Sequence, residues 1–72
     1  MVSPDGQLIA FMSNRSGKRD IWLVSSNGGE ARQFTYDGEN AWPSFSPDGK
    51  SLLWSSNRDG RTDLYIGRIA DR

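Results

Sequence analysis

Apolar residues gather into short runs along the chain, separated by stretches rich in Gly, Asn, Asp and Ser. Residues 8–12 and 21–24 form two such runs, and residues 52–54 and 64–66 form two more. Short apolar runs bounded by turn-forming residues are typical of β-strands. Turn signals recur too often for a helix, and no stretch of useful length repeats its apolar positions every 3.6 residues. The pattern therefore predicts an all-β chain.

Six strands follow from this pattern, in two sets of three. Gly-containing segments between them are expected to form the turns and loops, since Gly accepts positive φ without steric cost. The expected strands are residues 7–13, 19–25 and 31–36 in the first set and residues 41–46, 50–56 and 62–69 in the second.

The two sets are copies of one repeat. At an offset of 43 residues, segment 3–20 overlays segment 46–63 with nine of eighteen positions identical. Substitutions between the copies keep their character, as with Phe11 on Trp54. A period near 40–45 residues with β-type units is typical of a propeller blade. We therefore expect antiparallel β-propeller blades, about 1.7 repeats of ~43 residues, forming a partial propeller over residues 1–72.

The sequence Ser-Pro-Asp-Gly occurs at residues 3–6 and again at residues 46–49. Pro presets φ for the second position of a type I turn, Asp suits the third, and Gly suits the fourth. Asp5 and Asp48 are therefore expected to be structural turn residues that connect strands, with no catalytic role.

The first two strands of each copy are apolar at consecutive positions, so both faces of each sheet are apolar and both need a cover. Propeller blades meet this need by packing on a neighbour in front and a neighbour behind. Two blades alone leave two outer faces bare, and each face would expose more apolar area than a soluble monomer usually shows. We therefore expect the chain to self-associate or to belong to a longer propeller.

The amino-acid composition excludes several kinds of site and partner. The chain has no Cys and no His, which removes disulfides, imidazole bases and most transition-metal sites. Nine basic residues balance nine acidic ones, which argues against nucleic acid as a partner. No apolar run is long enough for membrane insertion as a helix, and Met1-Val2 leads into the first repeat without a signal peptide. We expect no cofactor and no metal.

The repeat resembles the WD40-like β-propeller repeat of the TolB type, over nearly the whole chain. The matching motifs are Ser-Pro-Asp-Gly at 3–6 and 46–49, Ser-Asn-Arg at 13–15 and 56–58, Asp-Ile-Trp at 20–22, Asp-Leu-Tyr at 63–65, and the outer-strand segment 28–35. The resemblance implies that residues 41–46 form an inner strand at the channel and residues 31–36 an outer strand. It also implies a periplasmic location if it extends to the parent protein.

Arg15 and Asp20 recur as Arg58 and Asp63, five residues apart across a loop. One interpretation is a ligand-binding charge pair. The other is a structural clamp, in which Asp accepts hydrogen bonds from the loop or pairs with Arg. Because the pattern recurs in each repeat, we favour the clamp for Asp20 and Asp63.

The loop 37–40 with its neighbouring Trp is the best candidate for a partner-binding face. The expected face consists of Arg15, Glu39, Asn40, Trp42, Arg58 and Arg61. Mixed charge around an aromatic side chain suits protein or peptide recognition. The competing interpretation is a solvated loop whose Trp packs between blades.

The sequence thus favours a non-catalytic propeller segment that acts as a protein–protein interaction scaffold, similar to TolB. The chain lacks a nucleophile elbow and a catalytic triad. Two alternatives stay open: part of the substrate-gating propeller of a prolyl-oligopeptidase-type serine peptidase, and binding of a small ligand or carbohydrate in the propeller channel.

Overall fold

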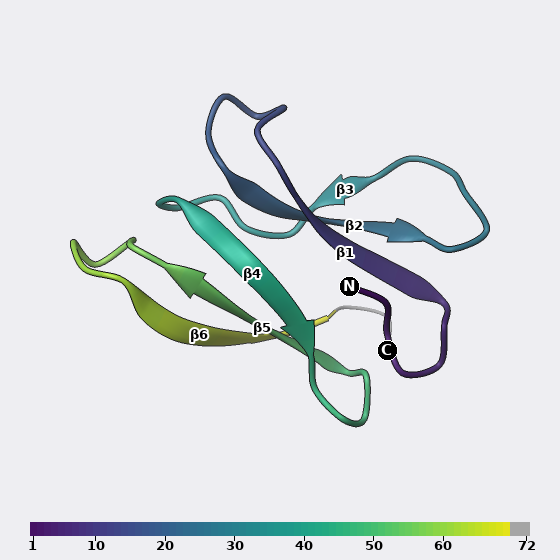
Figure 1. Cartoon of the computed structure of the whole chain (residues 1–72). Helices are drawn as coiled ribbons and strands as arrows, with labels where there is room; N and C mark the ends of the chain where they lie inside the picture. Colours follow the sequence, from purple (N-terminus) through teal and green to yellow (C-terminus); the bar gives the residue numbers. More distant parts are fainter. Residues whose placement is uncertain (70–72) are drawn as a thin grey trace.

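The computed structural model describes residues 1–69, and they form two three-stranded antiparallel sheets (Figure 1). The strands are β1 (Leu8–Ser13), β2 (Asp20–Ser25), β3 (Arg32–Gln33), β4 (Asn40–Phe45), β5 (Ser51–Ser56) and β6 (Asp63–Arg68). The sheet β1-β2-β3 is called blade one, and the sheet β4-β5-β6 is called blade two. The all-β, antiparallel fold expected from the sequence is confirmed. Within residues 1–69, no helix is long and apolar enough to span a membrane.

The two blades repeat one hairpin in the same register. In blade one, β1 pairs with β2 from Leu8↔Ser25 to Ser13↔Asp20. In blade two, β5 pairs with β6 over the positions 43 residues later, from Ser51↔Arg68 to Ser56↔Asp63. The sequence repeat is therefore a structural repeat, down to the facing pairs.

The Ser-Pro-Asp-Gly turns have the same hydrogen bonds in both copies. The N–H of Gly49 donates to the carbonyl of Ser46 at 2.8 Å, which closes the turn. The Ser46 hydroxyl donates to Asp48 at 2.6 Å, and the Lys50 N–H donates to the same carboxylate at 3.0 Å. These donors lower the pKa of Asp48, the Ser46 hydroxyl contributing most. Asp5 accepts the matching bonds from Ser3 and Gln7 in the first copy. Both aspartates thus organise a turn.

Strand β3 pairs with β2 over Arg32–Gln33, where the sequence pattern predicts residues 31–36. The ladder stops because the N–H groups of both Phe34 and Thr35 turn to the carbonyl of Ile21. The Thr35 hydroxyl then accepts a hydrogen bond from the Ile21 N–H at 2.9 Å. A side-chain hydroxyl thus replaces the last rung of the ladder.

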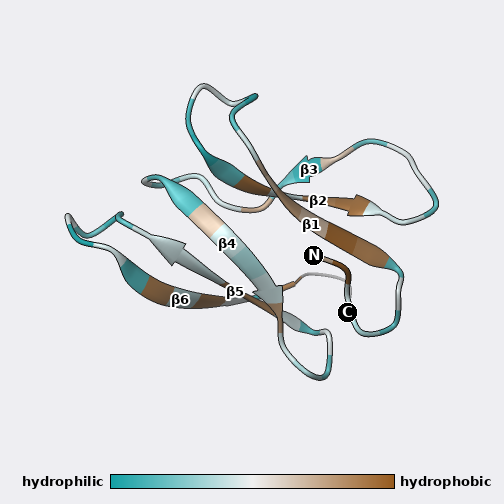
Figure 2. Ribbon diagram, viewed as in Figure 1, coloured by the Kyte–Doolittle hydropathy of each residue, from teal (hydrophilic) through white to brown (hydrophobic). Residues whose placement is uncertain are grey.

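The apolar core lies between the two blades. Blade one contributes Ala10, Ile21 and Leu23, and blade two contributes Leu52 and Trp54, all buried. Phe34 meets Trp54 edge to face, with ring centroids 5.4 Å apart. Figure 2 shows the strongest apolar colouring on β1, β2 and β6, while β4 is hydrophilic at its start and of intermediate hydropathy beyond it. The blades therefore stack through their apolar faces, and β4, at one edge of its sheet, contacts both β1 and β2 of blade one.

Candidate functional site

A β-bulge in β4 defines the candidate site. The pairing of β4 with β5 runs through Ala41↔Ser55 and resumes at Ser44↔Leu53, so two residues on β4 oppose one on β5. One of the two is Pro43, which has no N–H to give to a ladder. The other is Trp42, which has φ of 57° and is the one non-glycine residue with positive φ among residues 1–69. Its side chain is 77% exposed.

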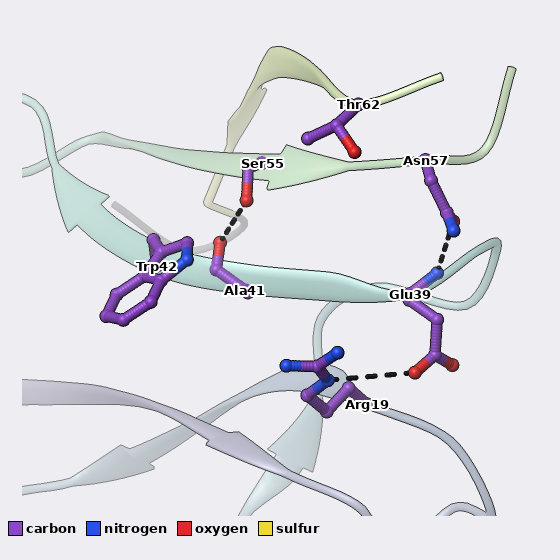
Figure 3. A pocket seen from close by; sticks show the side chains of 7 residues that line it. All are labelled: Arg19, Glu39, Ala41, Trp42, Ser55, Asn57 and Thr62. Carbon is purple, nitrogen blue, oxygen red and sulfur yellow. Dashed lines mark hydrogen bonds and ion pairs between the residues drawn. The ribbon is translucent and has the colours of Figure 1, made fainter. Parts of the chain in front are cut away.

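A cleft of about 240 Å³ lies beside this bulge (Figure 3). The residues that line it come from the β4 bulge, the end of β5 and the loops at the same end of the molecule. They are Arg19, Glu39, Ala41, Trp42, Ser55, Asn57 and Thr62. Below, this site is called the Trp42 cleft. It combines one exposed aromatic ring with polar and charged walls.

Contacts across the chain hold the walls of the Trp42 cleft. The Arg19 Nε lies 3.7 Å from the Glu39 Oε1, and both side chains are about half exposed. The Glu39 N–H donates to the Asn57 Oδ1 at 2.8 Å, and the Ser55 hydroxyl donates to the Ala41 carbonyl at 3.2 Å. The exposed ion pair contributes little stability. Backbone-anchored bonds therefore fix the cleft, and the ion pair forms its accessible rim.

Beneath the loop that carries Glu39 lies a buried polar cluster centred on Asp20, which is 0% exposed. The Asp20 carboxylate accepts five hydrogen bonds, from Ser16, Lys18, Gln33, Thr35 and Asn40, at distances between 2.8 and 3.0 Å. The last of these donors sits at the start of β4. The Asp20 cluster therefore joins blade one to blade two directly.

Burial acts to raise the pKa of the Asp20 carboxyl. The hydrogen bonds from Lys18, Thr35 and Ser16 outweigh burial and leave that pKa below its ordinary value. A carboxylate held ionised by several donors is a poor general acid or base at neutral pH. The cluster therefore has the chemistry of a structural clamp.

Asn40 lies in the Asp20 cluster, although the sequence analysis places it on a partner-binding face. Its side chain is 0% exposed, and its Nδ2 donates to Asp20 and to the carbonyls of Asp37 and Gly38. A partner cannot reach this amide in the folded chain. Asn40 therefore positions the loop that carries Glu39.

Arg15 and Arg58 lie over aromatic rings. The guanidinium of Arg15 is 4.9 Å from the ring centroid of Trp22, and that of Arg58 is 4.5 Å from the ring centroid of Tyr65. Neither side chain lines the Trp42 cleft. In the described residues Asp20 takes its cation from Lys18, where the sequence suggested Arg15 as one clamp partner.

Arg61 and Asp63 pair with each other at 3.0 Å, and both are substantially exposed. Asp63 occupies the repeat position of Asp20 but has a much smaller set of partners in residues 1–69. Within the described residues, Asp63 accepts a hydrogen bond from Arg61, whereas Asp20 accepts bonds from five side chains. The clamp is thus fully assembled around Asp20.

Sequence reasoning missed Arg19, Ser55, Asn57 and Thr62 as lining residues. The repeat could have identified Asn57, because Asn14 and Asn57 occupy the same position in the two copies. Almost nothing in the sequence pattern predicts the bulge that exposes Trp42. Across residues 1–69, no group of three or more acidic side chains is placed to hold a metal ion.

Comparison with known proteins agrees with this architecture. The sequence profile of the TolB beta propeller domain matches residues 1–72. A solved structure from Agrobacterium tumefaciens, assigned to TolB, is 38% identical and superposes with a TM-score of 0.87. The match covers 97% of this chain and 26% of that one, so the present chain spans about a quarter of that protein. No curated protein matches the chain. By its repeat, its fold and this profile, the chain belongs to the TolB beta propeller domain family.

Proposed function

We propose that this propeller segment is a non-catalytic scaffold that binds a protein or peptide partner through the Trp42 cleft. The contact consists of the Trp42 ring and the Arg19–Glu39 pair on the rim. Arg58 and Arg61 are exposed in the loop between β5 and β6 of the same blade, and Arg61 is paired with Asp63.

The conformation of Trp42 carries the proposal. A bulky residue with positive φ is strained, at a cost of about 1–3 kcal/mol, and such strain clusters at functional sites. Packing of the ring offsets little of that strain energy, because Trp42 is 77% exposed. An aromatic ring presented to solvent at an energetic cost is typical of an anchor for a partner, since Trp is enriched among the residues that dominate protein interfaces.

The size and walls of the cleft favour a peptide over a whole small ligand. Small-molecule sites usually enclose about 300–1,000 Å³ and are mostly apolar. The Trp42 cleft is smaller, at about 240 Å³, and its walls are largely polar. It fits one side chain of an extended partner, with Trp42 against that side chain and the Arg19–Glu39 pair available for polar contacts.

The residue inventory supports a binding role over catalysis. The sequence has no His and no Cys, and the buried carboxylate of Asp20 is engaged by five donors. An acid or base for catalysis needs a pKa near the working pH, whereas the pKa of Asp20 is lowered.

Selection of peptides from a random library on the immobilised chain tests the proposal. The affinity of the best peptide would then be measured by calorimetry for the wild type and for Trp42→Gly. We expect Trp42→Gly to weaken binding at least tenfold, which corresponds to about 1.4 kcal/mol. Glu39→Gln, on the rim, should weaken it by less than fivefold.

The matched control is Tyr36→Ser, which removes another exposed aromatic ring, 65% exposed in the wild type. This variant should bind the same peptide within twofold of the wild-type affinity. Equal binding to the wild type and to Trp42→Gly, or an equal loss in Tyr36→Ser, would rule out the Trp42 cleft as the contact.

A further inference from the structure

The outer face of blade two exposes two large apolar side chains side by side on β6. Leu64 is 78% exposed and Ile66 is 66% exposed. They alternate with Tyr65 and Gly67, which face blade one, so they point to the opposite side of the sheet. The face defined by Leu64 and Ile66 is called the tail face.

The same face of blade one is covered completely. Ile21 and Leu23 stand 43 residues before Leu64 and Ile66, and they are 0% and 1% exposed. Leu52 and Trp54 of blade two join them in one buried core cluster. The packing of Leu52 and Trp54 with Ile21 and Leu23 therefore shows which residues can cover a face like the tail face.

Blade one carries the counterpart of that covering surface on its other side. Ile9 and Phe11 stand 43 residues before Leu52 and Trp54, and they are half-buried. Trp22 and Val24 lie opposite them on β2, in the cross-strand pairs Phe11↔Trp22 and Ile9↔Val24. These four residues define the head face.

The head face and its internal counterpart also share their cationic cap. Arg15 lies over the rings of Phe11 and Trp22, as Arg58 lies over the rings of Trp54 and Tyr65. The part of the covering surface that β5 and β6 supply inside the chain is thus present a second time on β1 and β2, where it is half-buried. Strand β4, which contacts both β1 and β2, has no equivalent in the three-stranded sheet of blade one.

We propose that the tail face binds the head face of a second copy of this chain. The contact repeats the part of the interface in which Leu52 and Trp54 pack with Ile21 and Leu23, with Leu64 and Ile66 in the places of Ile21 and Leu23. It is heterologous, because two different surfaces meet, so successive copies form a closed ring or an open filament. The formal net charge of zero offers no long-range repulsion against this association.

Two variants, each blocking one face, test the contact. The tail variant carries Leu64→Lys and Ile66→Glu. The head variant carries Ile9→Glu and Val24→Lys, which places opposite charges on a cross-strand pair and so limits the cost to the strand pairing. Neither variant changes a residue that lines the Trp42 cleft. Sedimentation equilibrium from about 10 μM to 1 mM would measure the mass of each, and circular dichroism would check that each keeps its β-structure.

The apparent mass of the wild type should rise with concentration above the monomer mass of 8.1 kDa. Each variant alone should stay at the monomer mass, because a blocked head or a blocked tail leaves no complementary pair. An equimolar mixture of the two should form a dimer, since it holds one intact head and one intact tail. In the mixture the intact tail of one variant meets the intact head of the other, so a dimer there shows that each variant alone is monomeric because of its blocked face.

Three results would overturn the proposal. One is a wild type that stays at the monomer mass at every concentration. Another is a head variant that still dimerises alone, which indicates a symmetric contact between two tail faces. The third is a mixture in which no dimer forms.

Discussion

At the scale of single residues, Asp20 does more to fix the architecture than any charged residue on the surface. It is fully buried, it ends the β1–β2 pairing, and it reaches Asn40 at the start of blade two. A buried charge is tolerated only when it is paired and hydrogen-bonded, and Asp20 meets that condition with five donors.

Asp20→Asn should lower the free energy of unfolding by about 3 kcal/mol, because it removes the charge and turns an amide NH₂ toward groups that are themselves donors. Thermal melts at a fixed protein concentration would measure the loss. Asp63→Asn is the matched control at the same repeat position, with a half-exposed side chain paired to Arg61. The control should cost less than about 1 kcal/mol. Equal losses in the two variants would contradict the role of the Asp20 cluster.

The lowered pKa of Asp20 gives the stability a pH dependence of known sign. The unfolded carboxyl titrates near its ordinary value of about 3.9. The folded one titrates below that, so the unfolded state binds more protons in this range. The contribution of Asp20 is therefore fully present above about pH 5 and is lost as the pH falls through the folded pKa.

The difference in unfolding free energy between the wild type and Asp20→Asn should accordingly shrink as the pH is lowered from about 5 to 2. Urea titrations across this range would follow it. Taking the difference removes the contribution of Asp48, whose pKa is also lowered but which is present in both proteins. A difference that stays constant across the range would contradict the assignment.

Residue roles were only partly predictable from the sequence. The turn roles of Asp5 and Asp48 follow from local turn chemistry, and the structure has the corresponding hydrogen bonds. Two donors to Asp20 were not predictable, because Thr35 and Asn40 lie outside the repeated segments 3–20 and 46–63 and the repeat therefore does not identify them. The position of Arg15 over Phe11 and Trp22 depends on which side of the sheet the loop folds, which the strand pattern leaves open.

At the scale of elements, the bulge in β4 decides where Trp42 points. Trp42 precedes Pro43, and a residue before Pro is usually extended. The positive φ of Trp42 departs from that preference, so it could not be predicted from the sequence. The regular hairpins β1–β2 and β5–β6, by contrast, follow from their apolar runs and their turn residues.

Trp42→Gly should raise the free energy of unfolding by up to about 1 kcal/mol. Gly relieves the strain of positive φ but adds chain entropy in the unfolded state, and the exposed ring gives up little buried area. Trp42→Ala is the control, since it removes the ring but keeps a Cβ at positive φ. Thermal melts should order the stabilities as Gly above wild type, with Ala no higher than wild type. A less stable Gly variant would show that the ring is packed.

The loop between β3 and β4 depends on Gly38. Its φ is +74°, and a Cβ placed there would lie 2.8 Å from the backbone N of Arg58 and 2.9 Å from its Cα. Gly38→Ala should therefore cost about 3 kcal/mol, from the positive φ and from the displacement of the loop around Arg58.

Gly17→Ala is the matched control for Gly38, because Gly17 also has positive φ but its Cβ would meet open space. It should cost about 1–2 kcal/mol from backbone strain alone. Chemical denaturation of both variants would separate the two contributions. A loss in Gly17→Ala as large as in Gly38→Ala would show that the close approach to Arg58 adds nothing.

At the scale of the whole molecule, the 43-residue repeat predicted the most. It indicated two stacked copies with apolar residues on both faces, and the structure has the core between Ile21, Leu23, Leu52 and Trp54. What the repeat could not predict is the Trp42 cleft, because the cleft joins the end of blade one to the bulge of blade two. The 43-residue repeat therefore predicts the blade architecture, whereas the Trp42 cleft is seen only in the structure.

The most direct test of the two-blade architecture with one open face at each end is a concentration series of methyl NMR spectra on an Ile-, Leu- and Val-labelled chain. We expect the methyl signals of Ile9, Val24, Leu64 and Ile66 to shift as the concentration rises, because these groups line the head and tail faces. Those of Ile21, Leu23 and Leu52, which are already buried between the blades, should stay constant. Shifts at these three core residues, or no shifts at the four positions on the head and tail faces, would contradict the account.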